Sequence, residues 1–164
     1  MIQTISAFVN YYDGIRQRTL NYINTVPADQ IDWSPRAGEL TCGDIVRHLA
    51  AGEKMFCGVV VNGHWEYAGH AKNLAATRDE LIAYLGKIHG DAMSALRAID
   101  DSQLGEPRPA LKGGSVKAWR WLMAMVEHEV HHRSQLASHL SAMGVTPPHI
   151  YGLGIEDIVA LTTT

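Results

Sequence analysis

The sequence predicts an all-α protein, and more narrowly a four-helix bundle. Three observations lead to this prediction: four long segments repeat apolar residues at helical spacing, turn-rich stretches separate them, and no run alternates convincingly with the two-residue period of a strand. Amphipathic helices of this length cannot bury their apolar stripes alone, and packing four of them together solves that problem. At 164 residues the chain suits a single domain, 1–164. The long connections leave the winding order open.

The first two helices are predicted from apolar stripes and from end signals. The first ends before Pro27. The second begins after Thr41, because Thr41 and Asp44 have the form of a capping box, and Asn62 followed by Gly63 can stop it. The apolar faces comprise Ile5, Phe8, Tyr12, Ile15, Tyr22 and Ile23 in the first helix, and Ile45, Leu49, Gly52, Phe56, Val59 and Val60 in the second.

Two further helices follow after turn-rich connections. Thr77 and Glu80 form a second capping box, which opens the third helix. Ser115 is expected to cap a fourth helix that extends to Met143, and Gly144 beyond it favours termination there. Strands are expected to be nearly absent from the whole chain.

Composition and charge exclude several classes of function. A formal net charge of −3 provides no basic surface for nucleic acid, so nucleic-acid binding is not expected. No apolar run is long enough to cross a bilayer and no signal-peptide pattern is evident, so we expect a cytoplasmic protein without membrane association. Cys42 and Cys57 lie about 22 Å apart along one expected helix, too far for a disulfide, which agrees with a reducing compartment.

A histidine-rich run in the fourth helix is the most informative feature of the chain. His128 and His132 are four residues apart, which places them about 40° from each other around the helix axis. Two imidazoles one turn apart can bind one metal ion, and a third ligand from elsewhere would complete the open site that a catalytic metal needs. His131 is an alternative to His132, because an i,i+3 pair with His128 can also chelate, although the i,i+4 pair aligns better.

His48 is the expected third ligand. It lies beside Leu49 near the apolar face of the second helix, where an unpaired imidazole would cost about 1–3 kcal/mol. The alternative is a core histidine bonded to a carbonyl or a carboxylate. His139 lies about 10 Å beyond His132 along the helix, too far for the same ion. The remaining histidines are expected at the surface: His64, His70, His89 and His149.

Three neutral imidazoles suit zinc best by ligand type, with nickel or iron as alternatives. Such an ion lowers the pKa of a bound water or stabilises a thiolate. Asp44 lies one turn before His48 and could orient its ring, although helix capping is the simpler role for Asp44. Glu53, Tyr151 and Arg133 are candidates for substrate contact, and Arg133 is more simply expected to anchor neighbouring structure.

The same run also satisfies H-E-x-x-H, a metalloprotease motif in which Glu129 would be the general base. Three fixed positions make a weak signal. The longer metzincin form fails, because Gln135 and Ser138 stand where that motif requires glycine and histidine. No sheet is expected that could align a peptide substrate, so a protease is disfavoured.

Several short motifs, taken together, resemble the DinB/YfiT-like superfamily of metalloenzymes. The family pattern has a glycine where this chain has Ser134, which leaves the ligand positions intact. The motifs are His48 within Ile45-Val46-Arg47-His48-Leu49-Ala50, His128 followed by His132-Arg133-Ser134-Gln135, Trp33 and Pro35 ahead of the second helix, and Pro147-Pro148 followed by Ile150-Tyr151.

The resemblance implies an up-down-down-up bundle in which His48, His128 and His132 bind a divalent metal ion. It also implies homodimers, and it implies low-molecular-weight thiols such as mycothiol or bacillithiol as cosubstrates, as in the family's thiol-dependent transferases and maleylpyruvate isomerase. A thiol-dependent S-transferase acting on a small molecule is therefore the leading hypothesis. A metal-dependent hydrolase and a non-catalytic metal- or ligand-binding protein are the alternatives.

Overall fold

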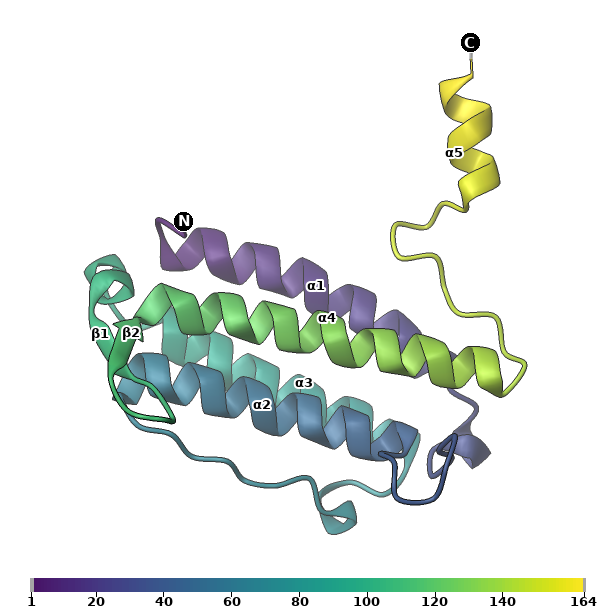
Figure 1. Cartoon of the computed structure of the whole chain (residues 1–164), viewed down its shortest axis with the longest axis horizontal. Coiled ribbons are helices and arrows are strands. Elements are labelled where there is room, and N and C mark those ends of the chain that lie inside the picture. Colours follow the sequence, from purple (N-terminus) through teal and green to yellow (C-terminus); the bar gives the residue numbers. More distant parts are fainter. Residues whose placement is uncertain (1, 164) are drawn as a thin grey trace.

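Four long helices run side by side in the computed structural model, which describes residues 2–163 (Figure 1). The expected all-α four-helix bundle is confirmed. The long helices are α1 (Ile5–Thr25), α2 (Cys42–Asn62), α3 (Arg78–Arg97) and α4 (Ala118–Ala142). The shorter elements are the 3₁₀ helices η1 (Ala28–Gln30), η2 (Lys72–Leu74) and η3 (Asp101–Gly105), the strands β1 (Pro107–Pro109) and β2 (Ser115–Lys117), and the helix α5 (Ile155–Thr162).

The four long helices follow the up-down-down-up order. One core cluster joins the first half of α1 to the first half of α4, and a second cluster joins their second halves, so α1 and α4 are parallel. The same two clusters place α2 and α3 parallel to each other and antiparallel to the other pair. The connection of residues 63–77, called here the crossover segment, must therefore run the length of the bundle from the end of α2 to the start of α3 (Figure 1).

Side-chain caps fix where the helices begin. Both predicted capping boxes are present, with Thr41 and Asp44 at the start of α2 and Thr77 and Glu80 at the start of α3. Each satisfies backbone N–H groups that a first helical turn leaves without partners. At the other end of α2, Gly63 adopts a φ of +76°, a left-handed conformation that glycine takes without strain and that stops the helix.

The start of α4 differs from the prediction. Ser115 does not cap the helix: it lies in β2, which pairs antiparallel with β1, and α4 begins at Ala118 without a side-chain cap. The N–H of Ala118 instead donates to the carbonyl of Glu106 at 2.9 Å. The hairpin escaped prediction because strands of three residues are too short to show alternation, and because proline stands at both ends of β1.

Two apolar clusters fill the bundle, one toward each end, and polar side chains lie between them. This polar layer consists of Arg16, Glu53, His89 and Glu129, so each long helix contributes one residue. The guanidinium of Arg16 lies 2.6 Å from Glu53 and 3.1 Å from Glu129, and His89 Nδ1 lies 2.7 Å from the other oxygen of Glu53. Tyr12 adds its hydroxyl, which donates to Glu129 at 3.2 Å.

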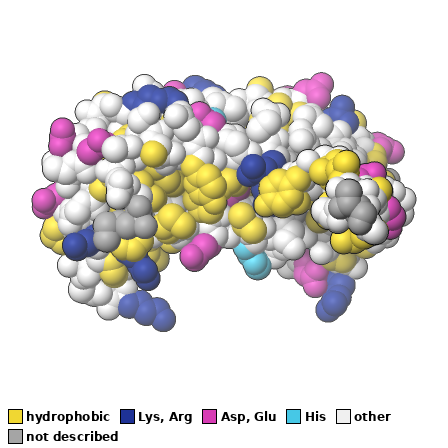
Figure 2. Space-filling view, turned by 90° about the horizontal axis from the view of Figure 1, so that it is seen from above, with side chains coloured by type: hydrophobic (Ala, Val, Ile, Leu, Met, Phe, Trp, Pro, Cys, Tyr) yellow, Lys and Arg dark blue, Asp and Glu magenta, His cyan; other side chains and the backbone are white. Residues whose placement is uncertain are grey.

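The C-terminal helix α5 stands away from the bundle (Figure 1). None of its residues is buried, and just before it the ring of Tyr151 lies over the guanidinium of Arg18 on α1. Hydrophobic side chains gather across the face of the bundle from which α5 projects (Figure 2). This helix is not among those predicted from the sequence. Among the described helices, none is both long and apolar enough to cross a membrane.

Candidate metal site

The two central helices of the site are α2 and α4, which run antiparallel and pack against each other. The Thr41 capping box sets the start of α2 and thereby the direction in which His48 points. On α4, His128 and His132 follow each other by one turn on the side that faces α2. The structure thus brings together three predicted residues, His48, His128 and His132, called here the histidine triad.

The nitrogen atoms of the triad lie close enough to share one ion. Each imidazole offers one ligand atom, and the three atoms all lie within 4.8 Å of one another. Nε2 of His128 lies 3.0 Å from Nε2 of His48. In a tetrahedral zinc site with bonds of about 2.0–2.1 Å, neighbouring ligand nitrogens are about 3.3 Å apart, so small side-chain movements would suffice for coordination.

In His48 and His132, Nδ1 forms a hydrogen bond to a neighbouring side chain, which leaves Nε2 available for a metal ion. Nδ1 of His48 lies 2.7 Å from the hydroxyl of Tyr67, and Nδ1 of His132 lies 2.7 Å from Oε1 of Gln135. The amide oxygen of Gln135 can only accept, so Nδ1 of His132 donates and carries the proton, which leaves a lone pair on Nε2. This arrangement is the one in which an imidazole binds a metal through Nε2.

All three imidazoles favour the neutral form that a metal requires. Burial, reinforced by the neighbouring imidazoles, lowers the pKa of His48 to about 4 and that of His128 to about 3. Burial also lowers the pKa of His132, although its bond to Gln135 acts in the opposite direction. The triad therefore stays neutral at neutral pH, so each imidazole has one nitrogen with a lone pair available.

Aromatic side chains border the triad on the side of His128. The ring of Phe56 meets that imidazole edge-on with centroids 5.7 Å apart, and Trp65 packs against Phe56 at 6.0 Å. Trp121 of α4 lies beyond, 4.8 Å from Trp65. These rings form an apolar wall beside the triad, built from α2, α4 and the crossover segment.

Other predicted residues lie outside the triad. His131 is exposed, with its ring centroid 4.9 Å from that of His132, and the structure brings His132 and not His131 into the group with His48. His139 lies outside the triad, as expected from its distance along the helix, and packs beside Trp33 and Cys42. Asp44 caps α2 and pairs with Arg47, so it does not orient the ring of His48.

Two histidines expected at the surface are partly buried and bind other side chains. Nδ1 of His70 lies 2.8 Å from the hydroxyl of Tyr67, which places it beside the triad. His89 is half-buried and bridges Glu53 and Asp13. Neither position was predictable, because His70 lies in irregular backbone and the partners of His89 are on other helices. His64 and His149 are exposed, as expected.

The structure also corrects two proposed roles for carboxylates. Glu53 is not a substrate contact, because it is 1% exposed and paired with Arg16. Glu129 is equally buried, and Arg16 and Tyr12 bind it, so it cannot serve as the general base of the protease alternative. Arg133 is buried, consistent with an anchoring role, and Tyr151 is exposed.

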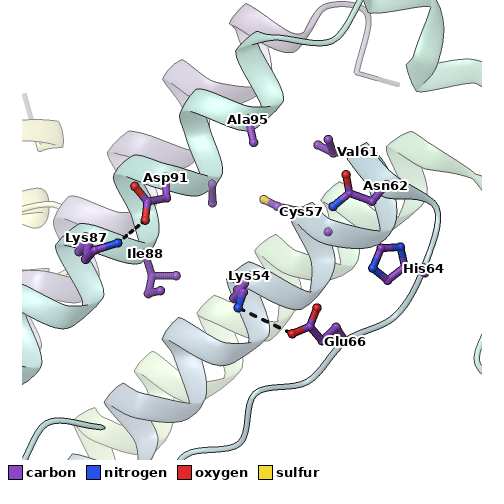
Figure 3. Close-up of a pocket in the computed structure, with 12 residues that line it drawn as sticks. Lys54, Cys57, Val61, Asn62, His64, Glu66, Lys87, Ile88, Asp91 and Ala95 are labelled. Atoms are coloured by element: carbon purple, nitrogen blue, oxygen red, sulfur yellow. Dashed lines mark hydrogen bonds and ion pairs between the residues drawn. The ribbon is translucent and has the colours of Figure 1, made fainter.

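A separate cavity of about 350 Å³ lies between α2 and α3, and no residue of the triad lines it. Figure 3 shows the ion pairs that flank it, Lys54 with Glu66 and Lys87 with Asp91. Cys57 lies at its edge but is 3% exposed. Cys57 and Cys42 are both free and buried. The balanced charges around this cavity point to no particular ligand.

The sequence matches the model of the DinB superfamily over residues 11–136, which includes all three histidines of the triad. The chain belongs to the DinB superfamily. The resemblance inferred from the short motifs is therefore confirmed. Among curated proteins, none matches the sequence.

Solved structures of DinB-like proteins share this fold. One from Bacillus subtilis is 21% identical and has a TM-score of 0.72, with 88% of this chain and 96% of that chain covered. One from Bacillus cereus ATCC 10987 is 19% identical, with a TM-score of 0.73 and coverage of 91% and 99%. YfiT from Bacillus subtilis, described as a probable metal-dependent hydrolase with an unusual four-helix bundle topology, is 18% identical, with a TM-score of 0.66 and coverage of 87% and 89%.

Proposed function

We propose that this DinB-superfamily protein is a metalloenzyme in which His48, His128 and His132 hold one divalent cation. One observation carries the proposal: three imidazoles from helices eighty positions apart in sequence present ligand atoms within 4.8 Å of one another. Zinc and nickel are the cations that an all-imidazole site favours. The similarity to YfiT, described as a probable metal-dependent hydrolase, supports a metal-dependent reaction.

The leading reaction is transfer of a low-molecular-weight thiol to a small electrophilic substrate. A divalent ion on three neutral ligands supplies positive charge that lowers the pKa of a thiol or a water at its open position. In the transfer, the thiol proton passes to solvent, a sulfur–carbon bond forms and the electrophile's leaving group departs. The wall of Phe56, Trp65 and Trp121 would hold the apolar part of the substrate beside the reacting sulfur.

The chain's own residues favour thiol transfer over chemistry that needs a protein base. Glu129 and Glu53 are both tied to Arg16, so neither is free to accept a proton from a substrate. A thiol activated by a nearby cation needs no such base. Free, buried Cys42 and Cys57 agree with a cytoplasmic location, where such thiols are reduced.

Elemental analysis of the purified protein tests the metal site. We expect about one zinc or nickel per chain, a loss of that metal in His48→Ala and in His128→Ala, and full retention in His64→Ala, a matched control on an exposed histidine. Equal metal content in wild type and His48→Ala would overturn the proposal.

Activity assays separate the proposed reaction from its alternatives. Thiol transfer predicts that the metal-loaded protein consumes monochlorobimane only when mycothiol or bacillithiol is added, and that His128→Ala abolishes this activity. A hydrolase, the second candidate, predicts turnover of ester or amide substrates without thiol. A metal-binding protein without catalytic function predicts neither.

We also propose that the protein forms a homodimer through α5. An isolated helix of eight residues is unstable in water, and α5 buries none of its residues against its own bundle. No Lys or Arg follows Arg133, and Glu156 and Asp157 make the tail acidic, which disfavours an anionic membrane as its partner. The hydrophobic face beside α5 offers a second copy a surface on which α5 can pack (Figure 2).

A further inference from the structure

The crossover segment contributes two side chains to the outer side of the triad. Tyr67 places its hydroxyl 2.7 Å from Nδ1 of His48, and Nδ1 of His70 lies 2.8 Å from the same hydroxyl. The rings of His48 and His70 lie near each other, with centroids 5.6 Å apart. The three groups form one chain of hydrogen bonds that starts at the triad and runs outward.

A buried arginine holds this part of the crossover segment in place. Arg47 is 1% exposed, and its Nε donates to the carbonyl of His70 at 3.0 Å. Its Nη1 donates to the carbonyl of Ala75 at 2.6 Å, and its Nη2 pairs with Asp44 at 2.7 Å. Because a buried guanidinium is costly without such partners, this anchor fixes the backbone of the segment.

A second anchor holds the segment on the other side of Tyr67. Nε1 of Trp65 donates to the carbonyl of Pro109 at 3.0 Å, and its ring packs against Phe56 and Trp121. Tyr67 lies two residues after Trp65 and three before His70, whose carbonyl Arg47 binds, so anchored residues flank it on both sides. Tyr67 is therefore positioned from both sides, independently of any metal ion.

We infer that Tyr67 and His70 are positioning residues that select the metal-binding tautomer of His48. The inference rests on the proposed metal site. For Nε2 of His48 to face the ion with a free lone pair, Nδ1 must carry the proton and donate it to the hydroxyl of Tyr67. That hydroxyl then donates its own hydrogen to Nδ1 of His70, which accepts. The donor and acceptor roles of His48, Tyr67 and His70 are thus mutually consistent.

The hydrogen-bond chain matters because His48 is the only triad member contributed by α2. Without an outer acceptor, a partly buried imidazole can carry its proton on either nitrogen, and a proton on Nε2 blocks coordination. His132 has Gln135 for the same purpose on its own helix. His48 has no such neighbour on α2 and depends on the crossover segment.

Metal affinity tests the inference. Zinc binding to the full-length protein would be measured by competition with a chromophoric chelator. Tyr67→Phe should bind zinc about 10–100-fold more weakly than wild type, the range typical of lost outer-shell partners. His70→Ala should weaken binding in the same direction. Tyr11→Phe, which removes the hydroxyl of another exposed tyrosine, is the matched control and should leave affinity unchanged.

A spectroscopic measurement separates positioning from a general effect on folding. In the cobalt(II) protein, the Nδ1–H proton of each bound imidazole gives a paramagnetically shifted NMR signal that exchanges with water. Tyr67→Phe should accelerate the exchange of one such signal, that of His48, and leave the His132 signal unchanged. Thermal unfolding of the metal-free variant should match that of Tyr11→Phe.

The outcomes distinguish this inference from the proposed function. If wild type binds neither zinc nor cobalt, the metal site itself is wrong. If wild type binds zinc, His48→Ala does not, and Tyr67→Phe binds as tightly as wild type with unchanged proton exchange, the metal site stands and the role of Tyr67 and His70 is overturned.

Discussion

Gly52 lies directly beneath the imidazole of His128. A methyl group in place of its hydrogen would lie 2.5 Å from Cε1 of His128, closer than such a carbon approaches other atoms in real structures, and 3.0 Å from Nδ1. Gly52 is one turn beyond His48 on α2, so the absence of a side chain there gives the ring from α4 its space beside the ring of His48. Close approach to a ligand group is one of the few reasons for glycine within a helix.

Gly52→Ala should therefore displace His128 and abolish or severely weaken zinc binding while the bundle remains folded. Gly58→Ala is the matched control in the same helix, because a methyl group at residue 58 meets no atom within 4 Å. We expect Gly58→Ala to retain zinc and to gain about 0.5–1 kcal/mol in stability from the better helix propensity of alanine. Zinc content and circular dichroism would measure both effects. Normal zinc affinity in Gly52→Ala would contradict the close contact.

The depressed pKa values of the triad should make the metal-free protein less stable in acid. The pKa of His48 is lowered to about 4 and that of His128 to about 3, from an ordinary value of 6.5. Above pH 6.5 both imidazoles are neutral in both states. As the pH falls from 6.5 toward 4, the unfolded chain takes up protons that the folded chain does not, so the free energy of unfolding decreases.

Urea unfolding in the presence of a chelator, at pH 7.5, 5.5 and 4.5, would measure this loss. The double variant His48→Gln/His128→Gln should lose less stability over the same interval. His89 provides an opposite contribution, because its bonds to Glu53 and Asp13 outweigh the effect of burial and raise its pKa. Comparison with the double variant cancels that contribution. An identical pH dependence in the two proteins would show that the triad is not desolvated.

Removing Arg16 from the polar layer while its carboxylate partners remain should strongly destabilise the protein. Arg16→Leu leaves Glu53 and Glu129 buried without the guanidinium that pairs with both, and we expect a loss of about 3–5 kcal/mol in the free energy of unfolding. The triple variant Arg16→Leu/Glu53→Leu/Glu129→Leu should recover most of that loss, because it removes the uncompensated charge. Arg97→Leu, which breaks an exposed pair with Asp13, should change stability by no more than about 0.5 kcal/mol. Urea titrations would compare the variants.

Substitution of exposed residues on α5 should dissociate the proposed homodimer. Ile155 and Val159 lie one turn apart on α5 and are 67% and 54% exposed. The variant Ile155→Ser/Val159→Ser should have the mass of a single chain by light scattering, where wild type has the mass of two. Leu111→Ser, on an equally exposed leucine of the β1–β2 connection, is the control and should remain a dimer. A wild-type protein with the mass of one chain would refute the proposed dimer.

Much of the fold could be predicted from the sequence because its signals are local. The capping boxes at Thr41 and Thr77 and the apolar stripes specify helices through contacts within a few residues. The pair of His128 and His132 was predictable for the same reason, since i,i+4 spacing alone places two rings on one face. Predicting His48 as the third ligand also required the assumption that α2 packs against α4.

The unpredicted parts depend on partners that are distant in sequence or on irregular backbone. Tyr67 and His70 lie in a segment without periodicity, so nothing local places them beside His48. The polar layer joins residues from four helices. The sequence alone does not show that Glu53 is buried, because its partner Arg16 lies on another helix. Glu129 shows the same difficulty: its motif suggested a catalytic base, whereas its neighbours make it part of the core.

The polar layer has a consequence for the alignment of the helices along their lengths. Arg16, Glu53, His89 and Glu129 come one from each long helix and meet at a single level. Sliding any helix by one turn, about 5.4 Å, would separate these charges and press them against hydrocarbon, whereas apolar stripes alone would tolerate such a slip. The ionic groups therefore lock the register between α2 and α4, and through it the spacing at which three imidazoles can meet.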